Sequence, residues 1–97
     1  MHYNDKISFE WDEVKNAQNI ETRNLSFEYA TNIFLDKDLL VTHDERHDYG
    51  ESRYVAMGKI DKRLYVVIFT MRENTHRIIS ARKANSREVK QYEEIYT

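Results

Sequence analysis

The segment LYVVIFTMRENTHRIISARKANSRE, residues Leu64–Glu88, predicts two neighbouring strands followed by the start of a helix. Leu64–Phe69 is nearly continuous apolar sequence, which is typical of a central strand covered on both faces. The polar turn Arg72–Thr75 is short enough for an antiparallel hairpin, and the β-branched residues of His76–Ala81 suit the next strand. This segment therefore predicts the middle of an antiparallel sheet.

A helix start follows this second strand. Asn85 or Ser86 can cap the helix, and Glu88 stands three residues after Asn85, which is the spacing of a capping box. Apolar residues that recur at strand or helix spacing indicate the other elements. These are strands at Ile7–Trp11, Leu39–Thr42, Arg53–Ile60 and Leu64–Met71, and helices at Glu13–Thr22, Ser26–Leu35 and Ser86–Ile95. We therefore expect an α+β fold, with an antiparallel sheet of about four to five strands, two N-terminal helices and one C-terminal helix.

Size and composition restrict the class of protein. The chain has 97 residues, enough for one hydrophobic core, so we expect a single domain over residues 1–97. The chain has no cysteine, and no apolar run approaches the ~20 residues of a membrane helix. We therefore expect a cytoplasmic protein that does not contact a membrane. The core is expected to contain Phe9, Trp11, Phe27, Ala30, Ile33, Phe34, Val55, Met57, Val66, Ile68, Ile78, Ile79 and Tyr92.

Cations cluster in the sequence where the last strand leads into the last helix. Arg77, Arg82, Lys83 and Arg87 can gather beside the helix N–H groups, an arrangement suited to phosphate. The alternative is that they are solvated charges around a buried strand. The chain carries 15 Lys and Arg against 17 Asp and Glu, so any affinity for nucleic acid is expected to be modest and salt-dependent.

Four ordered blocks of the chain resemble one protein family. They are FEWDEVKNAQN (Phe9–Asn19), LSFEYATNIF (Leu25–Phe34), ERHDYGESRYVAMG (Glu45–Gly58) and RIISARKANSRE (Arg77–Glu88), the last followed by Tyr92. Together they are similar to the BrnT toxins of bacterial type II toxin-antitoxin systems. The resemblance implies a RelE-like fold and an endoribonuclease that cleaves RNA and inhibits translation. It also implies a cognate BrnA-like antitoxin that is dimeric and binds DNA.

The chain departs from the family pattern before its second helix. Many relatives carry Lys-His-Gly there, whereas this chain has Thr22-Arg23-Asn24. Arg23 keeps a cation at this place, and Asn24 can adopt the left-handed conformation of the missing glycine. His47 also stands where an acidic residue is common. If the missing histidine is catalytic in relatives, this protein is instead a weak or inactive toxin that acts as an antitoxin-binding module.

RNA cleavage without a metal or other cofactor requires cations around the phosphate and groups that transfer protons. Arg53, Arg77 and Arg82 are the candidate catalytic arginines, because a guanidinium can hold two phosphate oxygens. His47 and Glu51 are the candidate acid and base. The alternative roles of these residues are ion pairs with Glu51 or Glu88, contacts with the antitoxin, and support of a turn. The candidate RNA-binding residues are Arg23, Lys83, Arg87 and, as a base-stacking side chain, Tyr49.

Two other interpretations of the sequence are weaker. His43 and His47 have a spacing that would suit a metal on a helix, but Gly50 and the neighbouring strands indicate a loop, so no metal site is expected. A general RNA binder without cleavage is a third possible function beside the toxin and the antitoxin-binding module. The acidic net charge argues against it.

Overall fold

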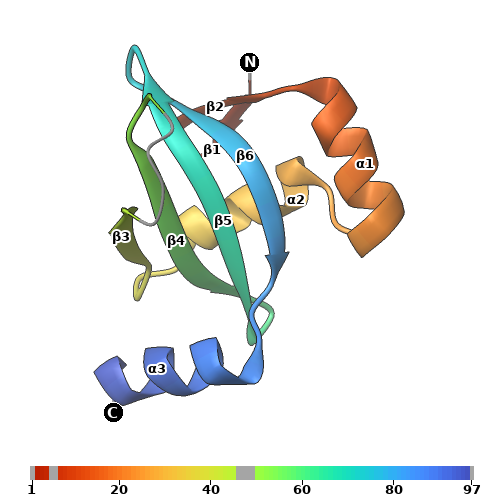
Figure 1. The fold of residues 1–97 in the computed structure, drawn as a ribbon. Helices are drawn as coiled ribbons and strands as arrows, with labels where there is room; N and C mark the ends of the chain where they lie inside the picture. The colour runs from red at the N-terminus through yellow and green to blue at the C-terminus, as the bar shows by residue number, and fades with distance from the viewer. Residues whose placement is uncertain (1, 5–6, 46–49, 97) are drawn as a thin grey trace.

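The computed structural model describes residues 2–4, 7–45 and 50–96, and in this part of the chain six strands form one sheet (Figure 1). The strands are β1 (His2–Asn4), β2 (Ile7–Trp11), β3 (Leu40–Asp44), β4 (Arg53–Ile60), β5 (Arg63–Arg72) and β6 (Thr75–Lys83). The helices are α1 (Glu13–Arg23), α2 (Phe27–Ala30), which continues as the 3-10 helix η1 (Thr31–Leu35), and α3 (Ser86–Tyr96). The predicted α+β class and the order of its helices are confirmed.

The sheet is mixed, with the order β1-β2-β6-β5-β4-β3. The hairpins β4–β5 and β5–β6 are antiparallel as predicted, but β2 runs parallel to β6 and pairs Glu10 with Arg77. The expectation of purely antiparallel pairing is wrong for this pair, because alternation of apolar residues does not encode the direction of a distant partner strand. The short edge strand β1 was also not predicted.

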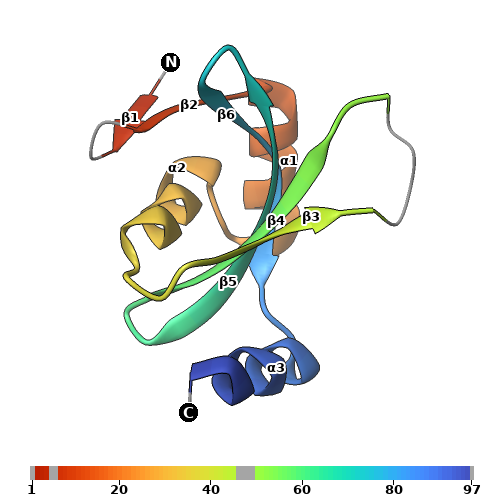
Figure 2. The same ribbon diagram turned by 90° about the vertical axis from the view of Figure 1, so that its left-hand side faces the viewer.

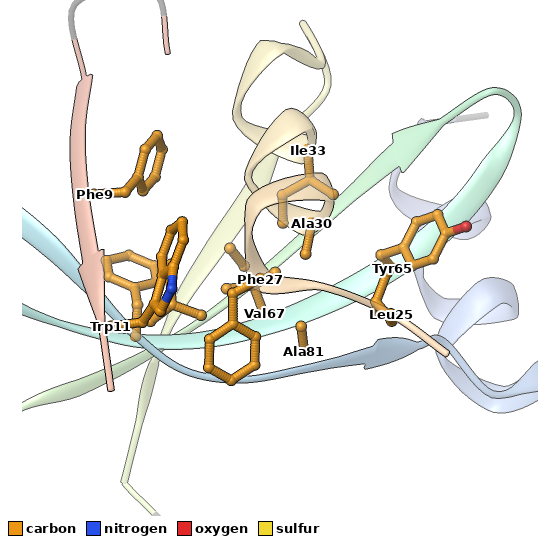
Figure 3. Packing of buried hydrophobic residues seen from close by; sticks show 12 residues of the cluster. Phe9, Trp11, Leu25, Phe27, Ala30, Ile33, Tyr65, Val67 and Ala81 are labelled. Atoms are coloured by element: carbon orange, nitrogen blue, oxygen red, sulfur yellow. The ribbon is translucent and has the colours of Figure 1, made fainter. Parts of the chain in front are cut away.

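One face of the sheet is covered by α2 and η1. Phe27, Ala30 and Ile33 are fully buried there, and Figure 3 shows them beside Val67 and Ala81 of the sheet. Ser26 starts this helical segment, because its Oγ accepts a hydrogen bond from the backbone N–H of Tyr29 at 3.0 Å. This face holds the larger core.

The opposite face is covered only in part. Figure 2 shows α2 on one side of the sheet and α3 beyond the end where β6 stops. Tyr92 of α3 is buried with Leu64 and Val66 in a second, smaller cluster. The predicted core residues Val55, Met57 and Ile68 are only partly buried on this face. Phe34 and Ile79, also predicted for the core, are partly buried elsewhere. A large part of this face therefore lies open beside α3.

Helix α1 lies beside the edge of β6 that β2 leaves unpaired (Figure 1). Asn19 is buried, and its amide nitrogen donates to the backbone oxygens of Leu25 and Ala81, each at 2.9 Å. Arg23 also donates to the oxygen of Ala81, at 3.2 Å. These two side chains therefore supply hydrogen bonds to the Ala81 carbonyl on the edge of β6. Asn24 ends the helix with φ 53° and ψ 40°, as predicted from its tolerance of the left-handed conformation.

Candidate functional site

Arg77, Thr70 and Arg53 stand in one row across the open face of the sheet. Arg77 is paired with Thr70, and Arg53 precedes Tyr54, which is paired with Phe69. Arg53 and Arg77 therefore flank strand β5, with Cα atoms about 10 Å apart at two strand spacings. Both side chains line a cavity of about 170 Å³, here named the arginine cavity. Its residues are Asp12, Lys15, Glu51, Arg53, Thr70, Arg72, Arg77, Ile78 and Ile79.

Each arginine of this cavity faces a carboxylate. Arg77 Nη1 donates to Glu10 Oε2 at 2.7 Å, whereas Arg53 Nε and Arg72 Nη2 lie 3.8 and 3.5 Å from Glu51. Three guanidinium groups therefore share two carboxylates. Lys15 adds a fourth cation and Asp12 a third carboxylate, so the cavity and its border carry one more cation than anion, a balance that suits a phosphate.

Two further residues that were not predicted as site residues shape the cavity. Thr70 is 3% exposed, and its hydroxyl donates to the backbone oxygen of Ser52 at 2.6 Å, which holds the segment between Glu51 and Arg53. Asp12 caps α1 by accepting from the backbone N–H of Val14 at 2.8 Å. A threonine within a strand carries no sequence signal for such a role. Lys15 was also not predicted as a site residue, although it stands in the first of the four family-like blocks, which is a signal that could have indicated it.

A bulge in β6 brings Arg82 to the same face as Arg77. Ile68 pairs with Ser80 but the next residue, Phe69, pairs with Ile78, so β6 contains one extra residue at this point. In a regular strand, positions 77 and 82 would point to opposite faces, because they are five residues apart and side chains alternate along a strand. Arg82 still stands about 13 Å from Arg77 along the sheet, four β5 positions away, and does not line the arginine cavity.

Arg82 is instead paired with the start of α3. Its Nη1 and Nη2 donate to the two carboxylate oxygens of Glu88 at 2.7 and 2.8 Å. Glu88 also accepts from the backbone N–H of Asn85 and donates its own N–H to Asn85 Oδ1, which confirms the predicted capping box. The hydrogen bond from Arg82 holds the pKa of Glu88 below its usual value. The Glu88 carboxylate therefore occupies the position at the start of α3 where the sequence predicts a bound phosphate.

Arg77 and Lys83 do not gather with Arg82 at the strand–helix junction as the sequence predicts, so the prediction is wrong for these two cations. Arg77 stands near the start of β6, and Lys83 points to the opposite face from Arg82, because they are adjacent in the strand. Lys83 lines a separate hollow there with Tyr29 and Tyr65. Arg87 is exposed on α3.

The remaining predicted residues have mixed outcomes. Glu51 lines the arginine cavity as described above, and Arg23 lies at the far end of α1. His47 and Tyr49 lie outside the described residues.

The imidazoles of His43 and His76 stand away from the arginine cavity. His43 Nδ1 lies 3.4 Å from Glu45, and His76 packs among Phe9, Phe34 and Phe69 on the other face. Burial lowers the pKa of His76, which keeps it neutral at pH 7. Within the described ranges, no group of three or more His, Asp or Glu side chains is arranged to hold a metal ion.

Within the part of the chain that the structure describes, no helix is long and apolar enough to cross a membrane.

No curated protein matches the sequence. A family model described as "Ribonuclease toxin, BrnT, of type II toxin-antitoxin system" matches residues 11–88. The match covers more than half of the chain and includes every residue of the arginine cavity, whereas Glu10, the partner of Arg77, lies one residue before the match. The chain therefore belongs to the BrnT family of ribonuclease toxins, whose members act in type II toxin-antitoxin systems with a cognate antitoxin.

Proposed function

We propose that this toxin cleaves RNA in the arginine cavity by metal-independent phosphodiester transfer, and that it thereby inhibits translation in the cytoplasm. The observation that carries the proposal is the pair of guanidinium groups, Arg53 and Arg77, on either side of β5 in one cavity. A phosphate between them would have cations on two sides. Charge that develops on its oxygens during the reaction would be stabilised by groups already in place.

The reaction is an intramolecular transfer at phosphorus. The ribose 2′ oxygen attacks the adjacent phosphorus, the bond from phosphorus to the 5′ oxygen breaks, and the products are a 2′,3′-cyclic phosphate and a 5′ hydroxyl. A base accepts the 2′ proton and an acid protonates the leaving 5′ oxygen. No water is consumed in this step. The arginines hold the non-bridging oxygens and align the reacting groups.

Glu51 is the proposed base, because its carboxylate lines the cavity between Arg53 and Arg72. Lys15 is the proposed acid, because this lysine of α1 lines the same cavity. His47 is close to Glu51 in the sequence and is the alternative acid. Arg82 has a supporting role in this proposal, since its bidentate pair with Glu88 holds the start of α3.

The cognate antitoxin is proposed to block the same cavity. An antitoxin segment with carboxylate side chains would bind Arg53 and Arg77 in place of RNA phosphates. Inhibition would then come from occupancy of the site. We also propose that the antitoxin is a BrnA-like dimer that binds DNA and bridges two toxins.

The test is RNA cleavage by the purified protein in the presence of EDTA, with analysis of the product ends. Arg53→Met and Arg77→Met are each expected to lower kcat by about 10²-fold, as for the loss of one oxyanion donor. Arg63→Met is the matched control, because Arg63 is exposed at the start of β5 and away from the cavity. It should leave kcat unchanged.

Three results would contradict the proposal: cleavage that stops in EDTA, product ends without a cyclic phosphate, or full activity of both cavity variants. If the wild-type protein leaves RNA intact and still binds its antitoxin, the antitoxin-binding module is the better account. Thermal unfolding of each variant shows whether it is folded.

A further inference from the structure

A second hollow continues from the arginine cavity along α1. It has a volume of about 530 Å³ and shares Lys15 and Ile79 with the arginine cavity. Gln18, Thr22 and Arg23 line its outer part. Because the two hollows share two lining residues, they are adjacent on the surface. We name this second hollow the α1 channel.

The polar side chains of the α1 channel follow one face of the helix. Lys15, Gln18 and Thr22 stand at helical spacings of three and four residues, which places them in a row. From Lys15 to Arg23 the row extends about 12 Å along the helix axis. The channel therefore begins at the proposed catalytic centre and ends at a second cation.

Arg23 is held in a defined position at that end. Its Nη1 donates to Asn19 Oδ1 at 3.3 Å and to the backbone oxygen of Ala81 at 3.2 Å. These bonds use one of its two terminal nitrogens, and the residue is exposed. A positioned guanidinium can bind a phosphate with less loss of side-chain entropy than a free one.

Gln18 and Thr22 offer neutral polar groups between the two cations. The hydroxyl of Thr22 donates to the backbone oxygen of Gln18 at 2.8 Å, so its oxygen can accept a further hydrogen bond. The side chain of Gln18 is exposed and can both donate and accept. Ile79 supplies an apolar surface at the junction with the arginine cavity.

We propose that the α1 channel is a subsite for the RNA nucleotides on one side of the scissile phosphate. In this subsite Arg23 binds the next backbone phosphate, Gln18 contacts a base edge or ribose hydroxyl, and Ile79 contacts a base or sugar. This inference rests on the proposed function, because it takes the arginine cavity as the place of cleavage. It predicts that affinity depends on RNA that extends beyond the scissile linkage.

The test changes the charge at position 18 and measures binding of a 2′-O-methyl RNA oligonucleotide, which cannot be cleaved. Gln18→Arg is expected to tighten binding several-fold and to steepen the dependence of log Kd on log salt by about 0.7. Gln18→Glu is expected to weaken binding by a similar factor. Gln91→Arg and Gln91→Glu are the matched controls, because Gln91 is an exposed glutamine on α3, outside both hollows.

A dinucleotide substrate provides the second measurement. It contains only the scissile phosphate, so the Gln18 variants should change kcat/KM for the dinucleotide by a smaller factor than kcat/KM for a longer RNA, which should follow the binding data. The inference is wrong if the Gln18 variants bind the oligonucleotide like their Gln91 counterparts. That outcome is separate from failure of the proposed function, which would appear as full activity of Arg53→Met and Arg77→Met on both substrates.

Discussion

Arg77 donates a 2.7 Å hydrogen bond to Glu10, its neighbour in the parallel pair of β2 and β6. The two residues are 67 positions apart in the sequence, and their side chains are 27% and 30% exposed. Glu10 therefore orients the guanidinium at the border of the arginine cavity, and it also competes with any phosphate for it. These two effects can be separated by mutation.

Glu10→Gln should lower both KM and kcat for RNA. KM falls because a competing negative charge is removed, and kcat falls, by about tenfold, because the guanidinium is held less well at the reacting phosphate. The free energy of unfolding should change by less than about 1 kcal/mol, since the pair is partly solvated. Steady-state kinetics with chemical denaturation measure all three quantities. Unchanged kcat and KM would show that Glu10 has no influence on Arg77 during catalysis.

Glu88→Ala should lower the free energy of unfolding by about 1–2 kcal/mol, because it removes the capping box and the partner of Arg82. The effect should depend on pH. The pKa of Glu88 is lowered in the folded protein, so its contribution is present above the ordinary glutamate pKa of 4.5 and is lost as pH falls below it. Urea unfolding of wild type, Glu88→Ala and Glu88→Gln measures the loss of stability at pH 7, and the difference between wild type and Glu88→Gln should shrink at pH 3.

Glu93→Gln is the control for this measurement, because Glu93 is exposed on the same helix. Its stability should follow the wild type at both pH values. A difference between wild type and Glu88→Gln that stays constant with pH would contradict the assigned role of the carboxylate.

Tyr92→Phe should lower the free energy of unfolding by about 1 kcal/mol, since the hydroxyl donates to Asp36 Oδ2 and lies 3.2 Å from it. Burial and the Asp36 carboxylate raise the pKa of Tyr92 to about 12. Stability from the neutral phenol is therefore fully present below the unfolded value of 10 and declines as pH rises toward 12. Ultraviolet titration of the folded protein should show one fewer tyrosine ionising near pH 12 in the variant. Tyr96→Phe, an exposed neighbour, should not remove that late transition.

Gly58→Ala should destabilise the protein by about 1–3 kcal/mol through overpacking. A Cβ at this position would lie 2.9 Å from both the Cβ and the backbone oxygen of Ile33, and 3.2 Å from Leu39 Cδ1. The backbone of η1 would have to move away from β4 to make room. Thermal unfolding measures the change, and a melting temperature equal to that of wild type would show that η1 can shift without cost.

Much of the local structure could be predicted from the sequence. Strand β4 begins and ends at the predicted residues, and the capping box of Asn85 and Glu88 forms as expected. These features depend on contacts within a few residues, for which periodicity and cap spacing are direct signals. The second helix forms at the predicted place, but only its first part, α2, is an α-helix. The rest is the 3-10 helix η1.

The arrangement of the site could be predicted only in part. Arg53, Arg77 and Glu51 were chosen for their chemistry, and they do line one cavity. Arg82 and Lys83 were placed with them because they are close in the sequence. The structure separates them, since Arg82 binds Glu88 and Lys83 points to the other face.

The sequence by itself determined the family, the elements and the apolar faces, because these follow from short-range patterns of residue type. Only the tertiary structure decided which cations share a cavity. That outcome depends on the parallel pairing of Glu10 with Arg77 and on the pairing of Arg77 with Thr70, whereas the extra residue in β6 decides the face on which Arg82 lies. Each is a relation between strands, and a shift of one residue turns every following side chain to the opposite face.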